Sequence, residues 1–362
     1  MSRTLSKKIK RLVVKLGSGT IAHYYKNPCA CGLASLIEEI GIVQKQGIQV
    51  VLVSSGSIVL GLGEINQTVR PAELSSLQAL AAIGQNVLMN VYTQLLEKNK
   101  LRCAQILLTW DDFSDRVRYN NARNTIGKIL DYGMIPIINE NDTISTEEIK
   151  FGDNDKLSAL VATLMGADLL LILSDVDGLY DTKSTERKVF CEIKDVTKDV
   201  ESLALGTSKK NVSKGGMITK LEAVKIVTHA NIPCIIANAQ APHVIQDILK
   251  GEHVGTLFVE KEEKLLARRH WVSFVAKPKG KIVVDAGAKQ ALLKAGKSLL
   301  LPGVLSWEGT FKKDDVVVIL SQEGQEIGRG ITNYSVSDLF RAEDKKQKIE
   351  VIHRDDMVLS AR

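Results

Sequence analysis

The 362-residue sequence is poor in the features that mark secreted and membrane proteins. Its five cysteines are scattered and odd in number, which argues against a disulfide framework and indicates a reducing compartment. The basic residues Lys7, Lys8, Lys10 and Arg11 precede only a short apolar run, which is not a signal-peptide pattern. No apolar stretch is long enough to span a membrane. We therefore expect a cytoplasmic protein with no membrane association.

Signatures of metal centres and of the common phosphotransferases are missing as well. Cys29 and Cys31 lie near His23, but no second ligand pair stands at zinc spacing, so we expect no dedicated metal site. There is no Walker A lysine motif. His353-Arg354-Asp355 is similar to a protein-kinase catalytic loop, but Ser360 stands where that loop requires asparagine. A phosphotransferase with this sequence would belong neither to the Walker A class nor to the protein-kinase class.

What the sequence does contain is an alternation of apolar runs and helical patterns over its first 260 residues. Hydrophobic residues make up 44% and charged residues 25%, which is ordinary for a globular protein. The net charge of +6 permits anionic ligands such as nucleotides without demanding nucleic acid. Continuous Val, Ile and Leu runs between helices predict an α/β fold, with a mostly parallel sheet covered by helices on both faces. The expected strands lie within residues 11–17, 48–57, 101–112, 133–142, 167–180 and 231–239.

The pattern changes near residue 260, and the alternation of strands and helices stops. From Gly280 the sequence has short apolar runs with turn glycines, interrupted by one short helical stretch at Ala286–Ala295. Two domains suit a chain of this length. We expect a first domain at 1–262, a linker at 263–278 and a small β-rich domain at 279–362.

The loops that follow the expected strands carry the candidate chemistry, because such loops meet at the ligand-binding edge of a parallel sheet. Lys15 precedes a turn with Gly17 and Gly19. Together with Ala22 these glycines fit a dinucleotide fingerprint weakly, whereas a lysine beside backbone donors suits a phosphoryl group. An exposed lysine at a turn remains the plain alternative.

Two further loops have glycines just before a helix. Ser54-Ser55-Gly56-Ser57 follows a strand and could hold a carboxylate or a phosphate at a helix start, or simply cap the helix. Gly215 and Gly216 open a helical run with Lys220 in its first turns, which again suits phosphate. A surface loop is the alternative for each of them taken singly.

Two clusters of carboxylates and amides occupy residues 139–142 and 152–155. They do not have the spacing of an EF-hand. They suit a ligand that carries hydrogen-bond donors, such as an ammonium group or lysine side chains. Helix capping by Asn154 or Asp155 would explain one residue but not both clusters.

Taken in this order, the segments resemble the amino-acid kinase family, in the branch that phosphorylates the side-chain carboxylate of glutamate. The resemblance covers essentially the whole chain, and the part from residue 279 onward resembles a PUA domain. It implies a three-layer α/β/α kinase domain followed by a small β barrel. The segments that carry it are VVKLGSGT, VSSGSI, AIGQ, PIINENDTI, EIKFGDNDKLSALVA, SDVDGLY and GGMITKL.

The resemblance implies ATP and Mg²⁺ as cofactors and L-glutamate as substrate, in the first step of proline biosynthesis. Lys15 and Lys220 would hold the transferring phosphoryl group, and Asp153 would organise them. Ser55 with Gly56, Asp142 and Asn154 would contact glutamate. The ATP side would consist of Lys15, Ser174, Asp175, Lys214, Gly215, Gly216, Met217, Ile218, Thr219 and Lys220.

The same resemblance implies proline as a feedback inhibitor, a reductase that receives the product, and a homo-oligomer, either a tetramer or a dimer. Lys214 departs from the family, which has a small hydroxyl residue before the glycine pair. A glutamate carboxylate has a pKa of about 4.3 and is ionised at neutral pH, so no general base is needed.

Two alternatives stay open at this point. A sibling amino-acid kinase would act on aspartate, N-acetylglutamate or a nucleoside monophosphate. An RNA-binding protein would use the kinase-like domain for regulation only, since PUA domains elsewhere bind RNA. Residues 280–362 have no strong excess of Lys and Arg over Asp and Glu and few aromatics, which argues against the second alternative.

Overall fold

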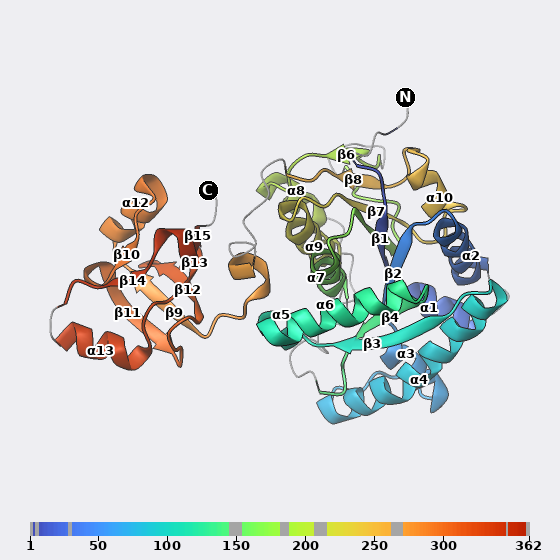
Figure 1. The fold of residues 1–362 in the computed structure, drawn as a ribbon, viewed down its shortest axis with the longest axis horizontal. Coiled ribbons are helices and arrows are strands. Elements are labelled where there is room, and N and C mark those ends of the chain that lie inside the picture. The colour runs from blue at the N-terminus through green and yellow to red at the C-terminus, as the bar shows by residue number, and fades with distance from the viewer. Residues whose placement is uncertain are drawn as a thin grey trace. The chain divides into compact units, whose positions relative to one another are not determined.

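The computed structural model describes residues 3, 7–27, 31–144, 154–181, 188–205, 216–261, 271–344 and 347–359. The chain forms two compact units, Met1–Lys264 and Leu265–Arg362 (Figure 1). No helix among these residues has the length and hydrophobicity that a membrane crossing requires.

The first unit is built on an eight-stranded sheet in the order β3-β4-β2-β1-β5-β7-β8-β6. The first six strands of this order run parallel to one another, and β8 is antiparallel to β7. The mostly parallel sheet predicted from the sequence is thus confirmed. The strands are β1 Arg11–Leu16, β2 Gln49–Ser54, β3 Cys103–Leu108, β4 Ile135–Glu140, β5 Leu169–Ser174, β6 Glu192–Ile193, β7 Cys234–Asn238 and β8 Thr256–Phe258.

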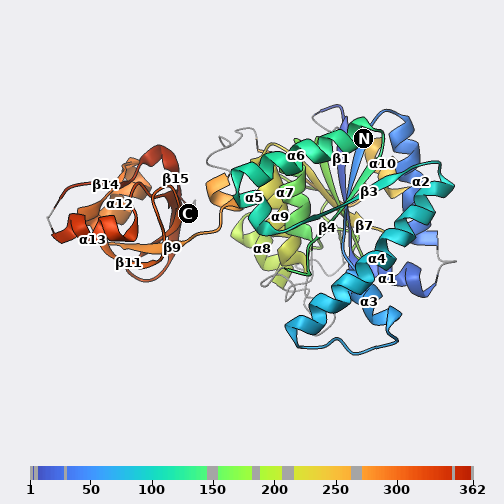
Figure 2. The ribbon, with the colours of Figure 1, turned by 60° about the horizontal axis from the view of Figure 1, so that its bottom comes forward.

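Helices cover both faces of this sheet, so the α/β/α layering is also confirmed (Figure 2). Helices α2, α4 and α10 pack on one face, where the main apolar core lies, and α6, α7 and α9 pack on the other. The central strands are apolar on both sides because both sides are covered. The helices are α1 Ser18–Lys26, α2 Cys31–Lys45, α3 Ser57–Glu64, α4 Leu74–Lys98, α5 Trp110–Ser114, α6 Arg116–Asp131, α7 Asp155–Met165, α8 Lys198–Leu205, α9 Met217–His229 and α10 Val244–Leu249.

Close packing of α3 on α4 fixes the position of the loop that follows β2. A Cβ atom built on Gly84 of α4 would lie 1.7 Å from the carbonyl oxygen of Ser57, the first residue of α3. A Cβ atom on Gly61 would lie 2.1 Å from the carbonyl oxygen of Leu80. Only glycine allows the two helix backbones to approach this closely.

The second unit is a small β-rich domain, as predicted. Its five-stranded sheet has the order β11-β9-β12-β13-β15, and β10 pairs with β14. Helix α12 begins and ends where the sequence indicated, whereas α13 was not anticipated. The elements are η1 Trp271–Val275, β9 Gly280–Val284, α12 Ala286–Ala295, β10 Leu299–Leu300, η2 Leu301–Gly303, β11 Val304–Gly309, β12 Val316–Ser321, β13 Glu326–Ile331, α13 Val336–Asp344, β14 Glu350–Ile352, η3 Arg354–Asp356 and β15 Met357–Leu359.

Part of the expected linker belongs to the packed structure of this second unit. Val272 and Ala276 are buried against Val316 and Ile331. The unit's main core is separate and includes Phe311, together with apolar residues of β9, β12 and β14.

Candidate active site

The candidate site lies at the carboxyl edge of the first unit's sheet. Strand β1 is central, with β2 on one side and β5 on the other, and such a change of direction in strand order is where α/β proteins bind ligands. Helices α1, α3, α7 and α9 all begin at this edge. Their free N–H groups and partial positive charge favour anions.

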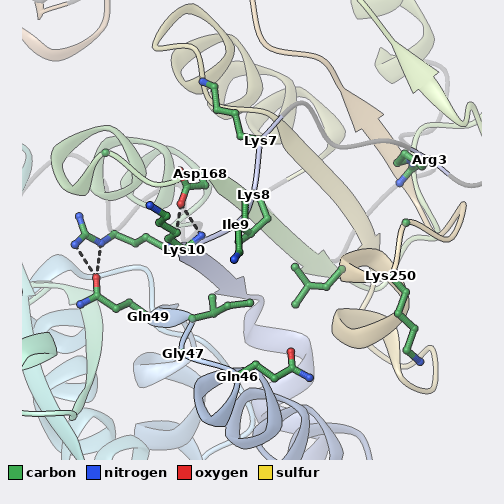
Figure 3. A pocket seen from close by; sticks show the side chains of 15 residues that line it. Arg3, Lys7, Lys8, Ile9, Lys10, Gln46, Gly47, Gln49, Asp168 and Lys250 are labelled. Atoms are coloured by element: carbon green, nitrogen blue, oxygen red, sulfur yellow. Dashed lines mark hydrogen bonds between the residues drawn. The ribbon is translucent and has the colours of Figure 1, made fainter.

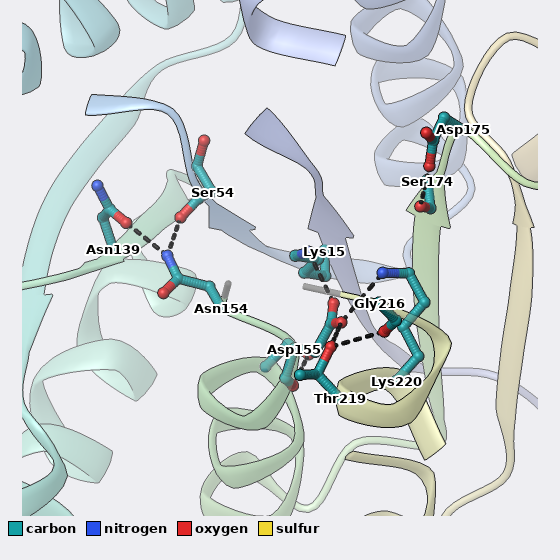
Figure 4. Close-up of polar contacts among 11 residues, drawn as sticks. Lys15, Ser54, Asn139, Asn154, Asp155, Ser174, Asp175, Gly216, Thr219 and Lys220 are labelled. Carbon is teal, nitrogen blue, oxygen red and sulfur yellow. Dashed lines mark hydrogen bonds and ion pairs between the residues drawn. The ribbon is translucent and has the colours of Figure 1, made fainter. Parts of the chain in front are cut away.

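At the centre of this edge two lysines share one carboxylate, and we call Lys15, Asp155 and Lys220 the lysine centre (Figure 4). Lys15 Nζ lies 2.7 Å from Asp155 Oδ1, and Lys220 Nζ lies 3.2 Å from Asp155 Oδ2. All three side chains are buried, and that of Asp155 is fully so. The described side chains of the centre are thus two cations and one carboxylate.

Local structure at the start of α9 holds the lysine centre in place. Gly216 precedes α9 in an extended conformation, and Thr219 lies in its first turn. Thr219 Oγ1 lies 2.9 Å from both Asp155 Oδ2 and the Gly216 carbonyl oxygen, either of which can accept its proton. On β7, burial and the Asp155 charge raise the pKa of the Cys234 thiol well above its usual value.

Beside the lysine centre, a chain of buried amides orients Asn154. Asn154 Nδ2 donates to the Ser54 carbonyl oxygen and, at 2.6 Å, to Asn139 Oδ1. Asn139 Nδ2 in turn donates to Gln85 Oε1 at 2.8 Å. Because both hydrogens of the Asn154 amide are used, its Oδ1 is left as an acceptor.

The amide chain borders a cleft, which we call the polar cleft, at the loops that follow β2 and β4. Ser57 Oγ donates to Asp142 Oδ2 at 3.2 Å. Ser55 Oγ is buried and has no hydrogen-bond partner among the described residues, which is typical of a group that binds a ligand. Gly56 has a φ of 106°, in the left-handed region that favours glycine. The cleft is lined by Ser18, Ser55, Gly56, Ser57, Ile58, Val59, Arg70, Asn139, Glu140, Asp142 and Asn154.

Its lining gives the polar cleft groups for both ends of a zwitterion. Glu140 and Asp142 supply carboxylates, and Arg70 supplies a guanidinium. Arg70 was missed by sequence reasoning, because a lone arginine in a loop carries no motif.

Ser174 and Asp175 lie on the other side of the lysine centre from Asn154 (Figure 4). Ser174 Oγ donates to Asp175 Oδ1 at 2.9 Å, at the end of β5. Two residues on, Asp177 accepts hydrogen bonds from Asn238 Nδ2 at 2.8 Å and from the Tyr180 hydroxyl at 2.7 Å. These bonds lower the pKa of Asp177 and tie the loop after β5 to the end of β7.

The structure brings most of the predicted site residues to this one edge. Lys15 and Lys220 meet at the lysine centre; Ser55, Gly56, Asp142 and Asn154 line the polar cleft; Gly216, Met217, Ile218 and Thr219 form the start of α9; and Ser174 and Asp175 end β5. Asp153, Lys214 and Gly215 lie outside the described residues.

Asp155, which contacts both lysines, was considered from the sequence only as a possible helix cap. The capping alternative for this region is not what the structure shows. Asn154 stands at the cap position of α7 and makes no capping hydrogen bond through its side chain. Gly56, which has no side chain, holds that position at α3. The signal for Asp155 was present in the sequence, as an acid at the helix start beside a strand-end lysine.

Comparison with known proteins defines the class. Residues 10–238 match the model of the amino acid kinase family, and residues 280–354 match the PUA domain. The chain therefore belongs to the amino acid kinase family and carries a PUA domain after its kinase domain.

Two relatives that match over nearly the full chain share one name. The glutamate 5-kinase of Dictyoglomus thermophilum is 45% identical over 368 residues, covering 98% of each chain. The glutamate 5-kinase of Carboxydothermus hydrogenoformans is 40% identical over 372 residues, covering 99% of each. Among solved structures, carbamate kinase from Giardia lamblia bound to AMP-PNP matches with a TM-score of 0.49 and 20% identity, over 70% of this chain and 99% of that one.

Proposed function

We propose that this protein transfers the γ-phosphoryl group of ATP to the side-chain carboxylate of L-glutamate, forming L-glutamyl 5-phosphate in the first step of proline biosynthesis. The observation that carries the proposal is the buried lysine centre, which lies between the polar cleft and the loop after β5. Relatives named glutamate 5-kinase, which match over nearly the full chain, support the choice of substrate.

The reaction needs charge stabilisation rather than proton transfer. A carboxylate oxygen of glutamate attacks the γ-phosphorus, the bond from that phosphorus to the β–γ bridging oxygen breaks, and ADP leaves with the electron pair. The attacking carboxylate is already ionised at neutral pH. The barrier is therefore the approach of two anions, which fixed positive groups lower.

Lys15 and Lys220 would supply that positive charge at the point of transfer. Asp155 holds both ammonium groups at 2.7 and 3.2 Å, so they are positioned before substrates bind. Because both ammonium groups are buried, they attract the phosphoryl group more strongly than an exposed lysine pair would. Removing one such preorganised donor typically lowers kcat by about 10² to 10³.

The polar cleft would hold glutamate by its α-carbon end. Asp142 and the Asn154 Oδ1 acceptor suit the substrate's ammonium group. Arg70 and the Ser55–Gly56 turn at the start of α3 suit a carboxylate. With both charged groups of the α-carbon held, the side-chain carboxylate would be directed toward the lysine centre.

ATP would occupy the side of Ser174, Asp175 and the start of α9. Mg²⁺ in kinase sites is held by one or two carboxylates together with substrate phosphates. Asp175, which directly follows β5, would hold the ion together with the phosphates of ATP. Its contribution when bound would be to neutralise phosphate charge.

The decisive test is hydroxamate formation from an acyl phosphate. The full chain, ATP, Mg²⁺ and hydroxylamine are mixed with glutamate, aspartate or N-acetylglutamate in turn. We expect product only with glutamate. Product only with another acid would move the protein to a sibling activity, and no product with any acid would favour the RNA-binding alternative.

Asp142→Asn tests the recognition of the ammonium group. Losing a charge-assisted hydrogen bond of about 1.5–3 kcal/mol should raise KM for glutamate about 10- to 100-fold while kcat changes little. Asp131→Asn, at the exposed end of α6, is the matched control and should leave KM unchanged. An Asp142→Asn variant with the parent KM would refute the assigned role.

Kinship with glutamate 5-kinases supports four further parts of the proposal. These are a cytoplasmic location, feedback inhibition by proline, a homo-oligomeric state of two or four chains, and delivery of the labile acyl phosphate to a reductase. RNA binding by the PUA domain remains a prediction, to be tested by salt-dependent binding of RNA to the full chain.

A further inference from the structure

A large basic cavity lies at the amino edge of the first unit's sheet, where β1, β2 and β5 begin (Figure 3). Its volume is about 1100 Å³. Its walls come from the segment before β1, the turn between α2 and β2, the turn after α7 and the turn after α10 (Figure 3). We call it the basic cavity, and its charged lining residues are Arg3, Lys7, Lys8, Lys10, Arg11, Lys250 and Asp168.

The lining of this cavity is strongly basic. One of the six lining cations, Lys250, is paired with Asp247 at 3.3 Å, so the six cations and the one lining carboxylate leave an excess of four positive charges. The carboxylate, Asp168, is engaged by the backbone. Its Oδ2 accepts the N–H groups of Lys10 and Arg11, each at 2.8 Å.

Three of the cations are held in place by neutral oxygens. Lys7 Nζ donates to the Asn231 carbonyl oxygen at 3.1 Å and to Asn231 Oδ1. Arg3 donates to three backbone carbonyl oxygens at 2.7–3.1 Å. Arg11 donates to Gln49 Oε1 at 2.7 and 3.0 Å and to the Met165 carbonyl oxygen. These bonds fix the guanidinium groups without neutralising them. Burial accordingly lowers the pKa of Arg3.

The competing explanation for these basic residues is that they stabilise the ends of nearby helices. Helices α2, α7 and α10 end at this edge, and basic residues near helix ends interact favourably with the last carbonyl oxygens. The bond from Arg11 to Met165, the last residue of α7, is of this kind. Lys8 and Lys10 differ, because their exposed ammonium groups bond no carbonyl oxygen and no carboxylate of a described residue.

We infer that the basic cavity is a second ligand site, separate from the lysine centre, and that it binds a small multivalent oxyanion. The volume of about 1100 Å³ slightly exceeds the usual range for small-molecule sites, about 300–1,000 Å³, and leaves room for such a ligand. Fixed guanidinium groups suit an oxyanion that needs several donors, and Lys8 and Lys10 supply mobile charges. An oligophosphate and a polycarboxylate share this chemistry.

The test is calorimetric titration of the full chain, without Mg²⁺, with tripolyphosphate and with citrate. The titration is repeated with Lys15→Met, which weakens phosphate binding at the lysine centre, so that binding that persists in this variant is assigned to a second site. We expect one ligand per chain, and binding by the doubly substituted variant Lys8→Gln/Lys10→Gln that is about tenfold weaker or more. The ligand that binds more tightly shows whether the site prefers an oligophosphate or a polycarboxylate.

The matched control is Lys98→Gln/Lys128→Gln, which removes the same charge from exposed positions on α4 and α6. This control should bind as the parent does. Equal weakening in both double variants would show a general charge effect and overturn the site. Loss of all binding in Lys15→Met would overturn it as well, by assigning the anion to the ATP site. Neither result depends on turnover, so the proposed kinase activity is tested separately.

Discussion

Asp155→Asn is the substitution that tests the lysine centre most directly. It removes the charge that lies 2.7 Å from Lys15 Nζ and 3.2 Å from Lys220 Nζ, and it changes little in side-chain volume. Both ammonium groups are then left buried without their shared carboxylate. Breaking a buried ion pair in this way typically costs 3–5 kcal/mol, so we expect the free energy of unfolding to fall by about that amount.

The same substitution should lower kcat because the two lysine side chains are no longer held in position. The two lysines repel each other once the carboxylate is gone, and they no longer point at one spot. The loss of one preorganised electrostatic group predicts a decrease in kcat of about 10² to 10³. Kinetics would be measured by ADP release with glutamate, and stability by urea unfolding of the same preparations.

A second variant separates the two effects. Lys15→Met added to Asp155→Asn removes one of the two ammonium groups that shared this carboxylate, so stability should recover in part while kcat stays low. Asp168→Asn, at the opposite edge of the sheet, is the control for loss of a structural carboxylate. Asp168→Asn should lower the free energy of unfolding and leave kcat unchanged. An Asp155→Asn variant that keeps kcat within about threefold of the parent would refute the assigned role, since a group of this kind is worth far more.

Two further predictions concern packing and pH. Gly84→Ala would place a Cβ atom 1.7 Å from the Ser57 carbonyl oxygen, so it should lower stability by about 1–3 kcal/mol and raise KM for glutamate. The control is Gly127→Ala in α6, where a Cβ atom meets open space, so this substitution should be neutral or stabilising. Thermal unfolding measures the stability of both variants. Burial raises the pKa of Glu39, although its carboxylate accepts the Ile245 N–H at 2.9 Å, so the folded state binds the proton more tightly than the unfolded state does. The free energy of unfolding should therefore fall as the pH rises from the ordinary pKa of glutamate through the raised pKa of Glu39. Urea unfolding of Glu39→Gln at the same pH values should not show this decline. An equal decline in the parent and in Glu39→Gln would assign it to other groups.

The sheet and its binding edge could be predicted because their causes are local in the sequence. Apolar runs such as those of β1 and β5 are buried on both faces, which only a covered parallel sheet provides. Handedness then places every following loop at one edge. The short strands β6 and β8 were missed, since two or three residues carry no measurable period. Helix α13 was missed although its start carries a signal, the reciprocal capping pair of Ser335 and Asp338.

The geometry within the site depended on contacts that the sequence does not show. Gln85 lies 54 residues from Asn139, yet their hydrogen bond determines which way the Asn139 amide points. That orientation in turn leaves Asn154 with an acceptor for the ligand. A sequence can supply amides at a strand end, but the direction of each amide follows from its packed neighbours.

The run Asp153-Asn154-Asp155 places two carboxylates within three residues. Successive residues of a helix point in directions about 100° apart, and helix starts are uncertain by one or two residues from sequence. Sequence reasoning gave the organising role to Asp153, which lies outside the described residues, and the described carboxylate that contacts both lysines is Asp155. We expect Asp155→Asn to lose both stability and kcat, and we expect Asp153→Asn to lower kcat if the role predicted from the sequence holds. A parent-like kcat in Asp153→Asn would refute that role and leave Asp155 as the organising carboxylate.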